Sequence, residues 1–143
     1  MNKAQEISDK LKTLLDWLAW SGQPFVNVFD YYTLQKTWFP YVAFECVWYT
    51  ATILDSCNNQ RNYLFDVHIF QEIIGNDRQE STQILYKAMS DVIDAIDTDY
   101  TLTWSCEAWV LPVAGNIQGI ITESGKALVL QIQIVCQSIT FIK

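Results

Sequence analysis

The sequence predicts an α+β domain in which two main helices pack on a mostly antiparallel sheet of four to five strands. Two segments carry apolar residues at helical spacing, and long segments rich in β-branched and aromatic residues lie between and after them. The chain has 143 residues, of which 50% are hydrophobic, enough to bury one core. Residues 1–143 are therefore expected to form a single domain with the element order α-β-β-β-α-β-β.

The first helix is expected over about residues 3 to 20. Its apolar residues recur every three or four positions, at Ile7, Leu11, Leu14, Leu15 and Leu18, and the sequence "SGQP" provides a stop. Trp17 and Trp20 widen the apolar face of this helix. An isolated helix of this length is marginal in water, so we expect it to dock on a large surface.

The middle of the chain predicts a long β-hairpin. A short strand or extended segment is expected at "FVNVFDYY", and a long strand follows at "FPYVAFECVWYTATILD". The polar sequence "SCNNQRN", Ser56–Asn62, is typical of a turn, and "YLFDVHIFQE" is expected to return as the partner strand. The hairpin tip is therefore predicted to be an exposed polar loop formed by Asn58, Asn59, Gln60 and Arg61.

The second helix is expected to follow a cap at Asn76 and to extend to about Asp97, because apolar residues again follow a helical period there. A capping box precedes each helix, Asn2 with Gln5 and Asn76 with Gln79. Two final strands are expected at Thr101–Val113 and Ala127–Ile142, the latter with alternating apolar and polar residues. The connection "AGNIQGIITESGK" between them has three glycines and predicts a long, mobile loop.

Charge and cysteine spacing argue against several classes of protein. The net charge is −7 and the pI is near 4.4, which disfavours wrapping of DNA or RNA, because phosphate binding requires clustered Lys and Arg. No apolar run is long enough for a membrane span, and the N-terminus lacks a signal peptide pattern, so we expect a soluble, non-secreted protein. No C-x-x-C pair occurs, so no metal or cofactor is predicted, and reduced thiols are expected at Cys46, Cys57, Cys106 and Cys136.

His68 is the single histidine of the chain and lies between Asp66 and Glu72. A catalytic interpretation would make one of these carboxylates orient the imidazole beside a nucleophile: Ser56, Ser81 or Cys106. The sequence has no nucleophile elbow and no glycine-rich phosphate loop. Alternation in a strand would place His68 on the face opposite Phe65, Val67 and Ile69. We therefore interpret His68 as a structural residue of that strand.

An acidic group stands at the end of the second helix, where the helix dipole favours cations: Asp91, Asp94, Asp97 and Asp99. One interpretation is a solvated face. The other is a contact with a basic surface on another chain, which on an adjacent subunit would be Arg78, Lys87 or Lys126. No D-x-[DN]-x-[DN]-G pattern is present, so a calcium loop is not indicated.

The order of "FPYVAFECV", "YLFDVHIFQE", "ILYKAMSDVIDAID", "YTLTWSCEAWVLPV" and "ALVLQIQIVCQ" resembles the tail terminator, or tail completion, proteins of long-tailed bacteriophages. The resemblance covers essentially the whole chain and rests on element order and texture. It departs from the family in its aromatic content, with six tryptophans and seven tyrosines.

The resemblance implies a structural virion protein without catalytic residues, assembled in the host cytoplasm and placed in the tail and neck. Such proteins form a homo-oligomeric ring, commonly a hexamer, that binds the last ring of tail tube protein and stops tube growth. The ring also presents a surface to a neck or head completion protein, and DNA only passes through its lumen. In such a ring, the hairpin tip of residues 58–61 would reach toward the lumen or a neighbouring ring, and the acidic group could meet a basic surface of the tube or neck protein. The alternatives are another neck or tail-tube ring component of the same virion and, more distantly, a small hydrolase.

Overall fold

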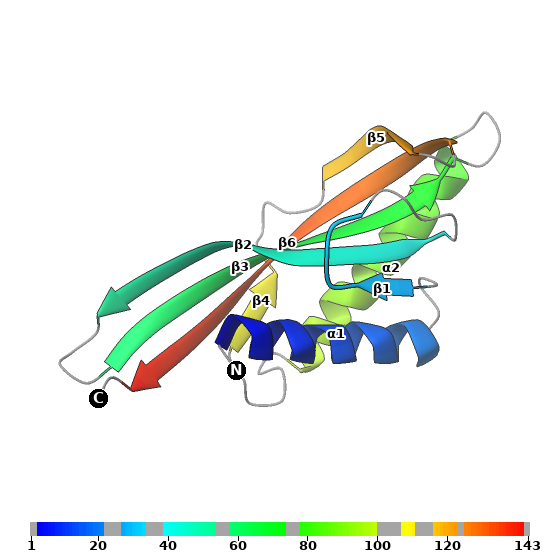
Figure 1. The fold of residues 1–143 in the computed structure, drawn as a ribbon. Helices are drawn as coiled ribbons and strands as arrows, with labels where there is room; N and C mark the ends of the chain where they lie inside the picture. Colours follow the sequence, from blue (N-terminus) through cyan, green and yellow to red (C-terminus); the bar gives the residue numbers. More distant parts are fainter. Residues whose placement is uncertain are drawn as a thin grey trace.

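The structure is a computed structural model that describes residues 3–21, 27–33, 39–53, 58–73, 78–99, 107–110, 116–122 and 125–141. These residues contain the two expected helices, α1 (Lys3–Ser21) and α2 (Gln79–Thr98). The strands are β1 (Asn27–Phe29), β2 (Tyr41–Ile53), β3 (Asn58–Glu72), β4 (Glu107–Val110), β5 (Asn116–Thr122) and β6 (Gly125–Phe141). Figure 1 shows both helices beside one long sheet, and the α+β class is therefore confirmed.

The sheet is mixed but mostly antiparallel, with the order β1-β2-β3-β6-β4 and with β5 also paired to β6. Strand β1 runs parallel to β2, and all other pairs are antiparallel. The sheet has six strands, one more than the upper limit predicted, because β5 forms where a loop was expected. Residues 116–122 pair with β6 from Asn116 opposite Gln131 to Thr122 opposite Gly125. The long edge of β6 supplies backbone partners that glycine content alone does not reveal.

Helix α1 agrees with its predicted range to within one residue. Helix α2 ends within one residue of the predicted Asp97, but it begins at Gln79, later than a cap at Asn76 implies. The predicted cap of α2 is wrong, because Arg78 occupies the N-cap position and its side chain makes no capping hydrogen bond. The amide of Thr82 instead donates to the Arg78 carbonyl at 2.9 Å, as in an ordinary first turn. Asn76 and Asn2 themselves lie outside the described residues.

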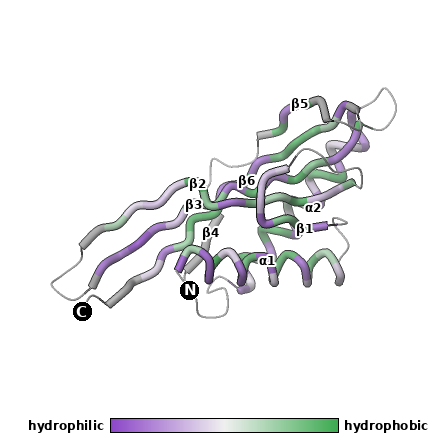
Figure 2. The backbone as a smooth tube through the Cα atoms, in the orientation of Figure 1, coloured by the Kyte–Doolittle hydropathy of each residue, from purple (hydrophilic) through white to green (hydrophobic). Residues whose placement is uncertain are grey.

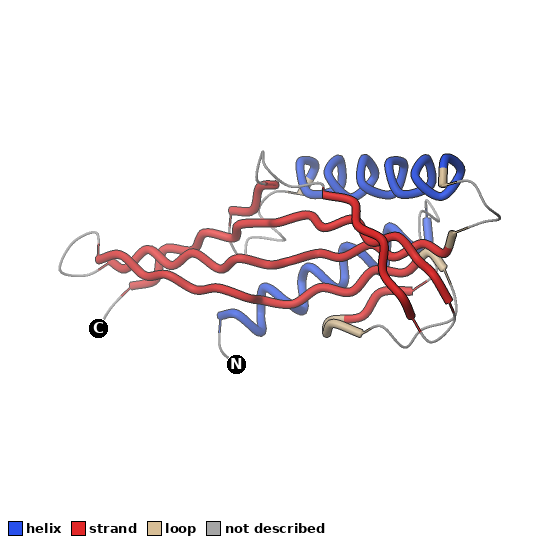
Figure 3. The backbone as a smooth tube through the Cα atoms, turned by 90° about the horizontal axis from the view of Figure 1, so that it is seen from above, coloured by secondary structure: helices blue, strands red, loops and turns tan. Residues whose placement is uncertain are grey.

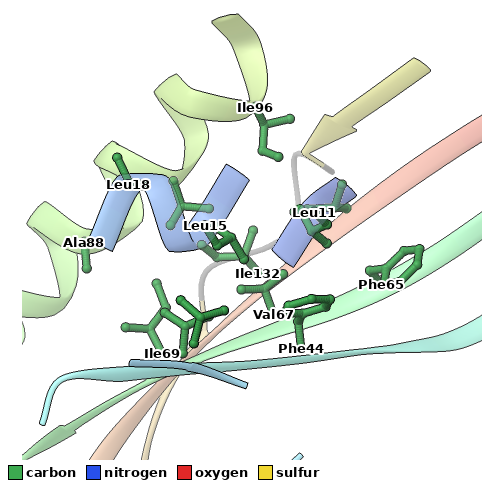
Figure 4. Close-up of a cluster of buried hydrophobic side chains, with 14 of the residues drawn as sticks. Leu11, Leu15, Leu18, Phe44, Phe65, Val67, Ile69, Ala88, Ile96 and Ile132 are labelled. Atoms are coloured by element: carbon green, nitrogen blue, oxygen red, sulfur yellow. The ribbon is translucent and has the colours of Figure 1, made fainter. Parts of the chain in front are cut away.

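The main core lies between the helices and one face of the sheet, as Figure 4 shows. Helix α1 contributes buried residues at the predicted spacing: Ile7, Leu11, Leu15 and Leu18. Helix α2 contributes Leu85, Ala88, Val92 and Ile96. The strands supply alternate residues, such as Phe65, Val67 and Ile69 of β3, because successive side chains point to opposite faces. Both helices thus cover the same face of the sheet.

A smaller cluster lies on the opposite face of the sheet and contains Tyr41, Ala43, Phe70 and Val129. The rings of Tyr41 and Phe70 stack with centroids 4.6 Å apart. The Tyr41 hydroxyl donates to the Thr33 carbonyl at 2.9 Å. Burial, with a smaller contribution from Tyr32, raises the pKa of Tyr41 to about 12, so its hydroxyl stays protonated and keeps donating. The Phe39–Pro40 peptide bond beside this cluster is cis.

Candidate assembly surfaces

Three strands continue beyond the helices as a long projection, which Figures 1 and 3 show from two directions. We call this projection the arm and define it as residues 48–53 of β2, 58–64 of β3 and 135–141 of β6. The arm is continuously paired, since β3 lies between β2 and β6 along its whole length. A register shift between Cys46 and Trp48 marks the point where β2 enters the arm. Such a bulge bends and twists a strand locally, so it marks the base of the arm in β2. At this base, Tyr63 and Cys136 still belong to the main core.

The expectation that Asn58, Asn59, Gln60 and Arg61 form a loop is wrong. All four residues belong to β3, where Asn59 is paired with Ile53 of β2 and with Thr140 of β6. The hairpin itself is confirmed, and its connection lies within residues 54–57, outside the described residues. Polar residues suit this strand because backbone pairing on both sides, not side-chain burial alone, holds a central strand. Figure 2 shows the hydrophilic stretch of β3 in the arm.

The arm exposes large aromatic side chains of β2. Trp48 is 63% exposed and Tyr49 is 51% exposed. Trp48 is paired with Leu64, which in turn is paired with Val135 of β6, so these three residues form an apolar row across one face. The sequence analysis did not predict this surface, because the pattern of a strand does not indicate which of its edges or faces remains uncovered. The run of uncharged residues "WYTATI", 48–53, is the signal that would have indicated it.

Helix α1 exposes two further tryptophans. Trp20 is 80% exposed and Trp17 is 59% exposed, whereas Leu18 between them is buried. The helix therefore docks through its leucine and isoleucine stripe, and the tryptophans lie outside it. Exposed large aromatic residues are enriched at protein interfaces, so this end of α1 is a second candidate contact surface.

His68 lies on the sheet face opposite the helices, as the alternation predicted, with the smaller cluster as its surroundings. Its ring packs edge-on against the ring of Tyr32, with centroids 4.9 Å apart, and stacks on the ring of Phe70, with centroids 6.2 Å apart. The side chain is half-buried, and its Nδ1 has no hydrogen-bond partner among the described residues. Asp66 instead accepts a hydrogen bond from Gln133 at 3.2 Å. Neither predicted carboxylate thus holds the imidazole by a hydrogen bond in the described structure.

The proposed nucleophiles are not brought to His68. The Ser81 hydroxyl donates to the Glu72 carbonyl at 2.8 Å, and Ser81 is buried at the start of α2, on the helix side of the sheet. His68 is on the other side, so the sheet itself separates the two groups. Ser56 and Cys106 lie outside the described residues. Within the described part of the chain, no nucleophile and base form a catalytic pair at His68.

The burial of His68 predicts a pH dependence of stability. Burial lowers the pKa of His68 below its ordinary value of 6.5, although the nearby carboxylates of Asp66 and Glu45 oppose the shift. A depressed pKa means that the unfolded chain binds the proton more readily, so stability is present above pH 6.5 and is lost as the pH falls through the folded-state pKa. Urea unfolding should therefore show that the parent loses more stability than His68→Gln between pH 8 and pH 5. An equal loss in both proteins would contradict this assignment.

The acidic group at the end of α2 contains one side chain that forms an ion pair and others that are exposed. Asp91 forms an ion pair with Lys87 at 2.7 Å, one helical turn earlier. The side chains of Asp94 and Asp97 are exposed, and no basic residue occupies the last turn of α2. Arg78 stands at the other end of the same helix, about 30 Å away at 1.5 Å per residue. Within one subunit, Arg78 therefore cannot neutralise this acidic end.

Lys126, another predicted contact residue, is exposed near the beginning of β6. It lines an open, mostly apolar hollow of about 490 Å³ with Ile73, Gly119, Ile120 and Ala127. The Ile73 amide donates to the Lys126 carbonyl at 3.2 Å, which places Lys126 beside the chain that leads into α2. Lys126 and the acidic end are thus associated with opposite ends of this helix.

Replacement of Asp94 and Asp97 together by Asn should stabilise the isolated subunit by up to about 1 kcal/mol at low ionic strength, because two anions leave the negative end of the helix dipole. Glu80→Gln provides a control of opposite sign, since Glu80 lies in the favourable first turn. Chemical unfolding in low salt measures both changes.

The same acidic end can be tested for a role in assembly. If it meets a basic partner, replacement of Asp91, Asp94, Asp97 and Asp99 together by Asn should weaken assembly and reduce its salt dependence. Unchanged assembly and salt dependence would leave only a solvated face.

Comparison of the sequence with models of known protein families and with curated proteins finds no match. In the part of the chain that the structure describes, no helix is long and apolar enough to cross a membrane. No group of three or more His, Cys, Asp or Glu residues in that part is arranged to hold a metal ion. Of the cysteines there, Cys46 is exposed and Cys136 is buried.

Proposed function

We propose that this protein is a ring-forming structural component of a bacteriophage virion that terminates the tail tube. In this role, several copies form a ring at the head-proximal end of the tube, stop the addition of tube subunits and offer a surface to the neck. The observation that carries the proposal is the projecting arm with exposed Trp48 and Tyr49. An extended sheet with exposed aromatic residues is better suited to binding a neighbouring protein chain than to enclosing a small molecule.

Three further features support the proposal. The acidic balance of the chain, with a net charge of −7, suits a lumen through which DNA passes, because like charge keeps phosphate contacts weak. The exposed aromatic residues at the end of α1 offer a contact surface away from the arm, as a protein between two partners requires. The order of elements that underlies the resemblance to tail terminators also agrees with the two helices and the long hairpin.

Two measurements on the purified protein test this proposal. Native mass spectrometry should show a closed oligomer of defined copy number, with six copies expected from the resemblance. Negative-stain microscopy of the protein mixed with tail tubes should show density at one end of each tube. A protein that stays monomeric and binds no tube would refute the proposal, and binding along the whole tube would favour a tube component instead.

A further inference from the structure

The outer edge of β2 in the arm has no strand beside it in the described residues. Strand β1 pairs with β2 only at Tyr41, Val42 and Ala43, at the opposite end of the strand. Among the described strands, β3 alone pairs with β2 from Trp48 to Ile53. In an antiparallel strand, alternate residues direct their N–H and C=O groups to the unpaired side. The arm therefore presents a row of backbone donors and acceptors to its surroundings.

The sequence of this edge favours pairing with another strand. The residues "WYTATI" include no charge, no proline and no glycine, and all except alanine are β-branched or aromatic. Proteins usually protect an open edge with lysine, proline or a bulge, or by keeping it short. The bulge of β2 lies before Trp48, so it leaves the following six residues regular. The exposed part of β2 thus lacks the common protections.

The opposite border of the same sheet is β4. This strand pairs with β6, from Glu107 opposite Gln137 to Val110 opposite Ile134, and it is the last strand in the sheet order. Each copy of the protein therefore carries two different borders, β2 and β4, on opposite sides of one sheet. Contact between unlike surfaces of identical subunits is head-to-tail, and it generates a ring when the rotation closes.

We propose that Trp48–Ile53 of one copy pairs with β4 of the next copy and continues the sheet from subunit to subunit. A second copy is the occupant because it supplies an extended strand that is already held by its own sheet, so little ordering entropy is lost. A charged peptide finds no opposite charge along "WYTATI", whereas β4 can join this edge through backbone pairing. This inference deepens the proposed function, since it names the contact that joins neighbouring subunits.

Hydrogen exchange of the backbone amides tests the pairing directly. Monomer and oligomer are compared at low and high protein concentration, with exchange followed separately in residues 48–53, 107–110 and 65–69. In the oligomer, amides of both borders should exchange at about one tenth of their rate in the monomer, or more slowly still, because each border gains a hydrogen-bonded partner. Residues 65–69 serve as the control, since β3 is already paired on both sides and should not change.

The possible outcomes separate this inference from the proposed function. Protection of residues 48–53 alone would indicate a symmetric pair of β2 strands and would overturn the head-to-tail contact. Protection of neither border in a proven oligomer would refute edge pairing and leave the ring intact. A protein that forms no oligomer, alone or with tail tubes, would refute both proposals.

Matched variants provide the second test. Trp48→Lys with Tyr49→Lys places charge on the open edge, and Tyr31→Lys with Tyr86→Lys makes a similar chemical change at exposed aromatic residues outside the arm and α1. Edge lysines disfavour strand addition, so the first pair should raise the dissociation constant of the oligomer by about tenfold or more, equivalent to 1.4 kcal/mol. The control pair should change the constant by less than about twofold, or roughly 0.4 kcal/mol. Equal effects of the two pairs, with both proteins folded by circular dichroism, would overturn the inference.

Discussion

Phe65→Ala should lower the free energy of unfolding by about 3 to 5 kcal/mol, the usual range when a buried phenylalanine is truncated. Phe65 is fully buried, and its ring lies 6.4 Å from that of Phe44, where the sheet passes from the core into the arm. The loss has two parts, the transfer free energy of the removed ring and the cavity that the surrounding strands cannot close. Since small domains are stable by only about 5 to 15 kcal/mol, this variant should unfold at much lower urea concentration.

The neighbouring residue offers a matched control for this variant. Leu64 precedes Phe65 in the same strand but lies on the opposite face and is only half-buried. Leu64→Ala should therefore cost much less, about 1 kcal/mol from its partial burial. Equilibrium unfolding in urea compares the two variants with the parent. Equal losses would show that the two faces of β3 are not buried as differently as described.

Leu15→Ala should destabilise the protein by about 2 to 5 kcal/mol, because Leu15 is fully buried on the side of α1 that faces the sheet and α2. Trp17→Ala is the control within the same helix, since Trp17 is largely exposed and its truncation opens no cavity. The control should change stability by no more than about 0.5 kcal/mol. Thermal or urea unfolding of the two variants and the parent measures both losses of stability. A larger loss for Trp17 than for Leu15 would contradict the docking of α1 through its leucine stripe.

The helices were the most predictable part of the fold. Their apolar spacing spans several turns, and the same residues that mark the period, such as Leu11 and Val92, are fully buried. Period-two alternation in the same way placed His68 and Phe65 on opposite faces of β3, as found. Both patterns are local, since each element carries enough residues to define which side faces the core.

The errors arise where pairing partners far apart in sequence decide the structure. Residues 58–61 have a composition typical of turns, yet β2 on one side and β6 on the other hold them as a central strand. Residues 116–122 contain Gly119 and lack strong alternation, yet the long edge of β6 pairs with them. The open edge of β2 was equally hidden, because an edge is a property of the sheet order and not of one segment.

The growth of tail tubes in the presence of the protein tests the central claim most directly. Purified tube subunits are polymerised with increasing amounts of the protein, and tube lengths are measured by negative-stain microscopy. A terminator should shorten the tubes as its ratio to tube subunits rises, with the protein found at one end only. Tubes of unchanged length, or protein distributed along them, would contradict the assignment.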